Sequence, residues 1–341
     1  MNHWRRWLAL AIGLGISGVF LYLALKGLNL GEVLIDLRTA RYGWLIPGVA
    51  VYFVAVWART WRWHYLLRPI QRIRLRDLFP VVVIGYMGNN VYPFRAGEVI
   101  RAWVLQRNAQ VAISASLATI IVERIFDGLV MLIFVFVALP FAPIPAPFDR
   151  IVVWMTLLFF GALAGFFVLA LRPEATRRLY TRAIHALVPA ERVRGAILHQ
   201  ADRFMEGLAS LRSPRDLLMT LLSSTLIWLT ETTKYWFVMH AFDFQVSFFV
   251  LMLMTAVVNL ATTLPSSPGY VGTFDEPGIE ILKVFGVEEN VAGAYTLVLH
   301  AALWLPITLL GFYYMARQGV KWGDFARATA AVRSSEFEGV Q

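Results

Sequence analysis

The stretch from Asn89 to Leu105 gathers charged and helix-breaking residues in a chain that is otherwise strongly apolar. It reads NNVYPFRAGEVIRAWVL, and Arg95 follows Pro93 at a predicted turn. A helix that begins after this turn leaves its first backbone N–H groups without partners, and a guanidinium beside such groups can bind a phosphate. For Glu98 and Arg101 the alternatives are a local ion pair three residues apart, or, for Arg101, anchoring at the cytoplasmic face.

Three charges lie inside the apolar run 113–139, at Glu123, Arg124 and Asp127. Each charge near the centre of a span costs about 2.5–3.5 kcal/mol on insertion scales, so the three require partners or water. Glu123 and Asp127 share a helix face and would repel each other, which requires a basic group opposite or a retained proton. Arg124 points about 100° away from Glu123 and is expected to pair elsewhere. The group is either a structural network or a proton relay or headgroup contact.

A third polar stretch, SSPGYVGTFDEPG, follows a long apolar run that begins at residue 248. Its turn-forming residues permit tight turns and free backbone groups. They are Pro268, Gly269 and Gly272. Asp275 and Glu276 then open a predicted short helix at 274–286, where acidic side chains offset the helix dipole. The alternatives for these acids are a contact with cationic or sugar groups of a substrate, and the carrying of a coupling proton.

Two further polar groups lie inside later apolar runs. Glu231 and Lys234 are three residues apart, so an internal ion pair is expected, with the wall of a wet cavity as the alternative. His300 lies in the last apolar run. We expect it to be a hydrogen-bonded packing residue, and a titrating role is the alternative.

The elements that position these residues follow from composition. Of 341 residues, 58% are hydrophobic and 16% are charged, and several apolar runs approach the roughly 20 residues that cross a bilayer as a helix. The class is therefore an all-α polytopic membrane protein, and continuous apolar runs exclude the alternation of a barrel. The chain has no cysteine, which excludes disulfides and thiolate sites. The net charge of +9 indicates arginine-rich loops facing anionic lipid headgroups rather than nucleic acid.

Six full spans are predicted, and the arginines orient them. The spans are 7–25, 43–63, 113–139, 151–171, 216–241 and 290–316. The first is interpreted as a retained anchor, not a cleaved signal. Loops 64–77 and 172–215 are rich in arginine and therefore cytoplasmic, while the uncharged, proline-rich loop 140–150 suits the outside. Both termini are then cytoplasmic, and a multi-pass protein of the plasma or inner membrane is expected.

Two apolar stretches, 78–92 and 248–286, remain outside this scheme. Each lies between segments on the same side, so neither can cross fully. We predict that both enter the membrane and turn back, with their broken backbone buried in protein or lining a wet cavity.

The element order predicts an inverted repeat of three spans each, with halves 1–140 and 150–316 in one membrane domain. The broken segments echo each other, since Asn90…Pro93…Gly97–Glu98 parallels Asn259…Pro265…Gly272…Asp275–Glu276. Such repeats point to a substrate site at their interface. The alternative is two unrelated polar loops. Residues 172–215 are predicted to be amphipathic helices at the cytoplasmic interface, and 317–341 a cytoplasmic tail.

The motifs NNVYPFRAGEVIRAWVL, ERIFDGLVML and NLATTLPSSPGYVGTFDEPGIEIL together resemble the flippase-like integral membrane family, also known as the lysylphosphatidylglycerol synthase transmembrane domain. The resemblance covers about residues 5–320. The family patterns fall on residues already singled out. These are Pro93, Arg95, Gly97, Glu98 and Arg101, then Glu123, Arg124 and Asp127, then Pro268, Gly269, Gly272 and Glu276. Asp275 precedes the family's usual acid and leaves open which carboxylate matters.

The resemblance implies movement of a polar-headgroup lipid between leaflets: a phospholipid, a glycolipid or a polyprenyl-phosphate lipid. No ATP motif, metal cluster or cofactor loop occurs in a supporting context, so no enzymatic activity, metal or cofactor is expected. The chain stops soon after its last span, so lysyl transfer is not expected either. The alternatives are a non-transporting subunit of a lipid-synthesis complex and an intramembrane lipid-headgroup enzyme. The partners are a membrane lipid as substrate, with a homodimer or a lipid-synthesis enzyme as further options.

Overall fold

The computed structural model describes most of the chain after residue 27. The described ranges are 28–92, 95–142, 172–187, 191–208, 213–263 and 267–321, with residues 15, 18–19, 21–26, 157, 160–161, 164, 168, 171 and 324. The predicted spans 7–25 and 151–171 lie largely outside these ranges, and Pro93 lies outside them entirely.

Every regular element of the described residues is helical, which confirms the all-α prediction. Along the chain they are α2 (Leu30–Thr39), η1 (Tyr42–Trp44), α3 (Leu45–Leu67), α4 (Leu75–Val91), α5 (Ala96–Ala109), α6 (Ile113–Ala138), α8 (Pro173–Leu187), α9 (Glu191–Gly207), α10 (Pro214–Met239), α11 (Phe248–Ala261), η4 (Pro268–Tyr270), α12 (Asp275–Val284) and α13 (Glu289–Arg317).

Helices α3, α6, α10 and α13 coincide closely with four of the predicted spans. Among the described residues, Tyr42–Leu67 and Glu289–Arg317 are long and apolar enough to cross a membrane. Helices α6 and α10 each have 26 residues but carry charged side chains within their length. The number of crossings and their orientation stay predictions.

Side chains next to the helix starts set where the long helices of the second half begin. Ser213 accepts the Asp216 N–H at 3.3 Å before α10, and Ser247 accepts the Val250 N–H at 3.3 Å before α11. Each hydroxyl thus satisfies one of the N–H groups that a helix start leaves without a partner.

Helices α4 and α5 form an antiparallel pair, called hairpin one below, and glycine permits its close packing. A Cβ atom at Gly97 would lie 1.9 Å from the Gly85 carbonyl oxygen, and one at Gly88 would lie 2.8 Å from the Gly97 Cα. Small residues let two helix backbones approach in this way. The predicted importance of Gly97 therefore has a packing reason.

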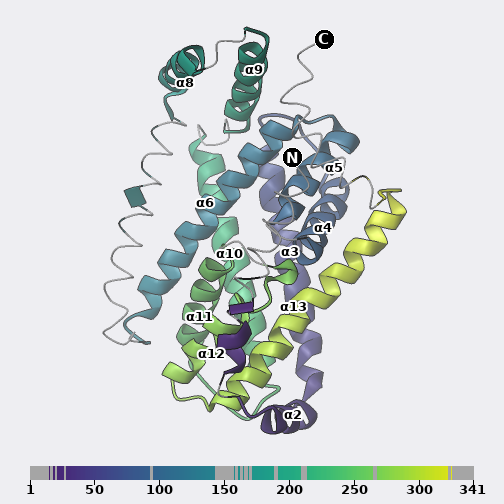
Figure 1. The fold of residues 1–341 in the computed structure, drawn as a ribbon, viewed down its shortest axis with the longest axis vertical. Coiled ribbons are helices and arrows are strands. Elements are labelled where there is room, and N and C mark those ends of the chain that lie inside the picture. Colours follow the sequence, from purple (N-terminus) through teal and green to yellow (C-terminus); the bar gives the residue numbers. More distant parts are fainter. Residues whose placement is uncertain are drawn as a thin grey trace.

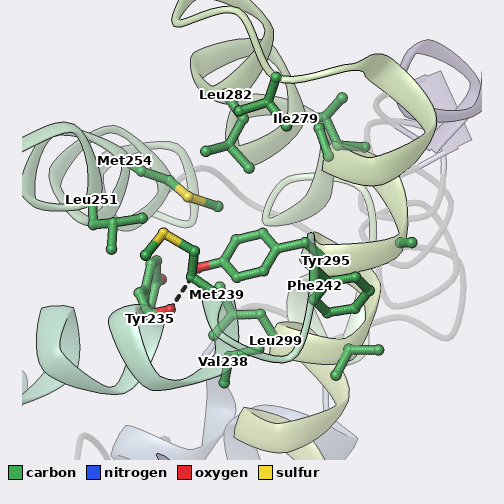
Figure 2. Close-up of a cluster of buried hydrophobic side chains, with 14 of the residues drawn as sticks. Tyr235, Val238, Met239, Phe242, Leu251, Met254, Ile279, Leu282, Tyr295 and Leu299 are labelled. Atoms are coloured by element: carbon green, nitrogen blue, oxygen red, sulfur yellow. Dashed lines mark hydrogen bonds between the residues drawn. The ribbon is translucent and has the colours of Figure 1, made fainter. Parts of the chain in front are cut away.

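Helices α11 and α12, joined through η4, form a second pair, called hairpin two below. Figure 2 shows Met254 of α11 and Leu282 of α12 packed beside Tyr295 of α13. The Tyr295 hydroxyl donates to the Tyr235 carbonyl oxygen of α10 at 3.0 Å, which satisfies both groups in this dry cluster (Figure 2).

The two hairpins lie in opposite halves of the molecule. Figure 1 shows α4 and α5 in the half that carries α8 and α9, and α11 and α12 in the half that ends at α2. Helix α3 packs on α10, α4 on α13, and α11 on α6. An inverted repeat predicts this exchange of partners, because each hairpin contacts the last long helix of the other half; the repeat itself stays a prediction.

Candidate functional site

The tips of the two hairpins meet on one face of α13. The Asn90 amide at the end of α4 donates to Thr308 Oγ1 at 2.8 Å and to the Trp304 carbonyl oxygen at 3.2 Å. Trp304 Nε1 in turn donates to the Asn90 carbonyl oxygen at 3.3 Å. The Arg95 guanidinium carbon lies 5.9 Å from the centre of the Tyr270 ring in η4. Segments about 175 residues apart in sequence therefore touch at one place.

Both tips hold a non-glycine residue in the left-handed region. Arg95 has φ 52° and Tyr270 has φ 62°. Such conformations cost about 1–3 kcal/mol each and persist where the surrounding structure fixes them, often at functional sites. Gly269 has φ 72°, and a Cβ atom there would lie 2.8 Å from Trp304 Nε1, so only glycine fits. Pro268 begins η4, and the Gly272 N–H, at φ 82°, donates to Asp275 Oδ2 at 2.8 Å.

A cavity of about 140 Å³ lies where the tips meet. One water needs roughly 10–15 Å³ on this measure, so the cavity holds several. Its charged lining is Arg59, Arg95, Arg124 and Glu231. Amide, imidazole and aromatic side chains complete the wall: Asn89, Asn90, Asn259, His300, Tyr52, Tyr86, Trp228, Tyr235, Tyr270, Phe274 and Trp304.

A second cavity of about 270 Å³ adjoins the first between α5, α6 and the end of α11. It shares Arg95, Arg124 and Asn259 with the first cavity. Glu98 and Asp127 are its acids, and it reaches the exposed Thr263. The shared arginines therefore stand between the central cavity and a route toward the surface of the helix bundle.

Several buried polar atoms around these cavities meet no hydrogen-bond partner in good geometry, although two of them, the Nε atoms of Arg95 and Arg124, lie 3.2 Å and 3.8 Å from the Glu98 carboxylate. The Nε atoms of Arg95 and Arg124 and the Oδ1 of Asn89 are buried without a hydrogen bond. Asn89 is only 8% exposed. Buried polar groups are nearly always satisfied, so the unpartnered Asn89 Oδ1 indicates a place that water or a ligand occupies.

The acids of α6 find their basic partner in α3. Arg62 Nη1 donates to Asp127 Oδ1 at 2.6 Å and to Ser224 Oγ at 2.8 Å, and Arg62 Nε lies 3.8 Å from Glu123. Of the two options left open for these acids, the opposite basic group is the one observed. Arg124 pairs with Asp127 at 3.1 Å.

The local pair between Glu98 and Arg101, one of the alternatives for these residues, does not form. Arg101 Nη2 donates to Glu123 at 2.5 Å, and its guanidinium lies 4.2 Å from the centre of the Trp63 ring. Arg101 is 4% exposed, so it is enclosed in the helix packing. Glu98 instead contacts Arg95 at 3.2 Å and Arg124 at 3.8 Å. Tertiary packing brings α6 to α5 and overrides the pairing within one helix.

Glu231 and Lys234 form the expected internal pair, with an addition from α3. Arg59 Nη1 donates to Glu231 Oε1 at 2.5 Å, and the Arg59 guanidinium lies 5.2 Å from the centre of the Trp228 ring. Glu231 and Arg59 also line the central cavity, so the ion pair between these two residues forms part of the cavity wall.

Asp275, and not Glu276, faces the site. Asp275 Oδ1 lies 2.7 Å from Nδ1 of His300, whose Nε2 lies 2.7 Å from the Gly269 carbonyl oxygen. The adjacent Glu276 points about 100° away on the same helix and is partly exposed. The position of α13 thus gives Asp275, and not Glu276, a contact with a residue of the cavity wall; a functional role for either carboxylate stays a prediction.

The most important residues that the sequence analysis missed are Arg59 and Arg62. Both lie inside an apolar run that was interpreted as a plain span. They lie at the cytoplasmic end of the predicted span 43–63, where arginine is ordinarily an interface anchor, so the available signal was the need of Glu123 and Asp127 for a cation. Glu123 and Asp127, in another predicted span, already required either a basic group opposite them or a retained proton.

Comparison with known proteins extends this description. The family model of the lysylphosphatidylglycerol synthase TM region matches residues 10–311. A UPF0104 membrane protein of Methanothermobacter thermautotrophicus is 27% identical over 290 residues, covering 79% of this chain and 82% of the relative. A second protein of that description from the same organism is 27% identical over 302 residues, covering 82% and 87%.

One relative carries a biochemical name. The glycosyltransferase AglD of Haloferax volcanii is 24% identical over 325 residues, covering 86% of this chain and 52% of that protein. No solved structure matches the chain significantly.

Proposed function

This chain belongs to the lysylphosphatidylglycerol synthase transmembrane-region family, and from that premise we propose that it moves a lipid with a phosphate-bearing headgroup between leaflets. The lipid is a phospholipid, a glycolipid or a polyprenyl-phosphate type. Movement requires no ATP hydrolysis and no chemical change in the lipid. We place the protein in the plasma or inner membrane with both termini in the cytoplasm.

Uncompensated positive charge around the hairpin tips carries the proposal. The described network holds six cationic side chains against four carboxylates, an excess of two positive charges. The cations are Arg59, Arg62, Arg95, Arg101, Arg124 and Lys234, and the acids are Glu98, Glu123, Asp127 and Glu231. Each of these cations has a carboxylate neighbour, but the net excess of positive charge within a membrane domain is costly, so an anionic ligand would offset it.

Arg95 and Arg124 are the proposed phosphate ligands. Both line the central cavity and its neighbour, and the Nε of each is held only by a salt bridge to Glu98, without a well-formed hydrogen bond. Guanidinium groups match phosphate geometry with two parallel bonds. A headgroup passing from one cavity to the other would keep both arginines in reach, while its hydrocarbon chains stay in the bilayer.

Glu98 and Asp127 occupy these arginines when no lipid is bound. Glu98 lies 3.2 Å from Arg95, and Asp127 lies 3.1 Å from Arg124. A phosphate would compete with the carboxylates for the same N–H donors. Binding therefore exchanges one anionic partner for another, and each guanidinium keeps an anionic partner throughout. Rocking of one half against the other then gives alternating access.

The proposal is tested in vesicles of phosphatidylcholine that contain a trace of fluorescent phosphatidylglycerol. Purified protein should let an impermeant quencher bleach inner-leaflet lipid over time, because that lipid reaches the outer leaflet. Arg95→Gln and Arg124→Gln should slow this movement at least tenfold, whereas Arg203→Gln on the surface of α9 should leave it unchanged. A wild-type rate equal to that of protein-free vesicles would refute the proposal.

A second candidate is a membrane subunit that serves a lipid-modifying enzyme. The relative named a glycosyltransferase favours it, because the matched region covers only 52% of that protein and is joined there to further sequence. Chromatography of the vesicle lipids separates the cases. A chemically altered lipid would indicate an enzyme. If the lipid is neither moved nor altered, the result favours the subunit role.

A further inference from the structure

His300 makes two hydrogen bonds that a neutral histidine cannot make together. Nε2 lies 2.7 Å from the Gly269 carbonyl oxygen, which only accepts, so this nitrogen carries a hydrogen. Nδ1 lies 2.7 Å from Asp275 Oδ1. A neutral imidazole has one N–H, and an ionised carboxylate has none to offer. Either His300 is doubly protonated, or Asp275 keeps a proton and donates it to Nδ1.

Both arrangements contain the same number of protons. The His300–Asp275 pair holds one proton more than a neutral histidine beside an ionised aspartate. The other carboxylate oxygen, Oδ2, accepts the Gly272 N–H at 2.8 Å, which is compatible with both arrangements. We infer that His300 and Asp275 form a proton-binding site whose proton binds together with an anionic headgroup in the adjoining cavity, so that a proton gradient drives transport. This inference rests on the proposed function.

His300 lies among the charged residues of the cavity wall, so the charge of its proton affects how the cavity binds an anion. His300 itself lines the cavity, and the Phe274 ring lies 4.6 Å from its imidazole. Besides Asp275, the ionisable groups that share this cavity with His300 are Arg59 of α3, Arg95 of α5, Arg124 of α6, Glu231 of α10, and the tyrosines Tyr52, Tyr86, Tyr235 and Tyr270. Arg59 pairs with Glu231, Arg95 with Glu98 and Arg124 with Asp127. The positive charge near this wall is therefore the excess of two in the wider set of six cations and four acids described above.

Charge then fixes the sign of the coupling. With its proton, the His300–Asp275 pair is neutral and leaves the positive wall free to attract an anion. Without it, the pair adds one negative charge at the cavity edge and repels the headgroup. Each ligand therefore strengthens binding of the other by the same factor, as linkage requires. A factor of about ten lies within the range usual for two coupled sites in one protein.

The same proton also fastens hairpin two. The bond to Asp275 holds the start of α12 against α13, and the bond to Gly269 holds η4. When the proton leaves, the imidazole can donate only one of these bonds. The tip next to Arg95 is then released from one of its two attachments, so the cavity opens in the state that repels the headgroup.

The first experiment measures binding and needs no transport. Dihexanoyl phosphatidylglycerol keeps one negative charge across the pH range, and its affinity for the detergent-solubilised full chain is measured at about pH 5 and about pH 8, which bracket histidine titration. The wild type should bind roughly tenfold more weakly at the higher pH. Asp275→Asn should remove the difference, because its amide can donate to a neutral imidazole at Nδ1 and keep both bonds without the extra proton.

Two further variants complete the set. His300→Gln should also remove the pH dependence, which protects the test if the first variant folds poorly. His240 directly follows α10 and does not line the cavity, so His240→Gln should keep the pH dependence. Affinity of the wild type that is equal at both pH values, or a pH dependence that survives in Asp275→Asn and His300→Gln, would overturn the proton site.

The second experiment imposes a pH gradient on the lipid-movement assay. Fluorescent phosphatidylglycerol should accumulate in the leaflet facing the alkaline side with the wild type and distribute evenly with Asp275→Asn. Even distribution with the wild type, despite movement, overturns proton coupling. No movement with or without the gradient, together with pH-dependent binding, overturns the lipid-transport proposal and leaves the proton site standing.

Discussion

Replacing Arg62 by methionine should lower the free energy of unfolding by about 3 kcal/mol. The Arg62 side chain is fully buried and donates to Asp127 at 2.6 Å and to Ser224 at 2.8 Å. A charged hydrogen bond contributes about 1.5–3 kcal/mol, and removing one partner of a buried ion pair costs about 3–5 kcal/mol. Asp127 retains Arg124 at 3.1 Å, and Glu123 retains Arg101 at 2.5 Å, which places the loss at the lower end.

The assay is unfolding in detergent micelles by increasing dodecyl sulfate, followed by circular dichroism. The matched control is Arg203→Met, which removes a surface pair with Glu206 at 3.1 Å and should cost about 0.3–0.5 kcal/mol. Asp127→Asn should cost less in the Arg62→Met background than in the wild type, because the two side chains interact directly. A loss for Arg62→Met no greater than the control's would refute the reasoning.

Two other predictions concern packing and orientation. Gly97→Ala should lower the melting temperature in detergent, because the new Cβ would lie 1.9 Å from the Gly85 carbonyl oxygen. The control is Gly195→Ala, whose Cβ would have nothing within 4 Å and which should stabilise α9 by about 0.5–1 kcal/mol. Equal changes of melting temperature in the two variants would contradict the close approach of α4 and α5. The chain has no cysteine, so Arg72→Cys should react with an impermeant maleimide only from the cytoplasmic side and Gln245→Cys only from the outside; labelling of both from one side would reject the predicted topology.

The positions of the long helices could be predicted from the sequence because they depend on local properties. Apolar runs gave the positions of α3, α6, α10 and α13, and proline and glycine marked where the chain breaks near Arg95 and Gly269. A break in an apolar run requires free backbone groups, and those groups require a polar partner at the same depth. A shared site between the two broken segments was inferred from the predicted inverted repeat.

Partner choice within the site could not be predicted in the same way. The rule for residues three apart pairs Glu98 with Arg101, but the rule does not include the approach of α6, which presents Glu123 to Arg101. The distinction between Asp275 and Glu276 likewise depends on where His300 stands. Arg62 could have been found from sequence by asking which cation in another span answers Glu123.

Helix α13 fastens both tips at successive turns, with His300 holding hairpin two and with Trp304 and Thr308 holding hairpin one. Pro306 lies within the same stretch, and its missing N–H leaves the Ala302 carbonyl without its helical partner. The helix therefore lacks one backbone hydrogen bond at Ala302, which lies between His300 and Trp304, that is, between the attachments of the two hairpins. Bending of α13 at this point would move one hairpin tip relative to the other while both tips keep their hydrogen bonds to the helix. The helix that holds the two tips together at the central cavity thus also contains a site where it can bend.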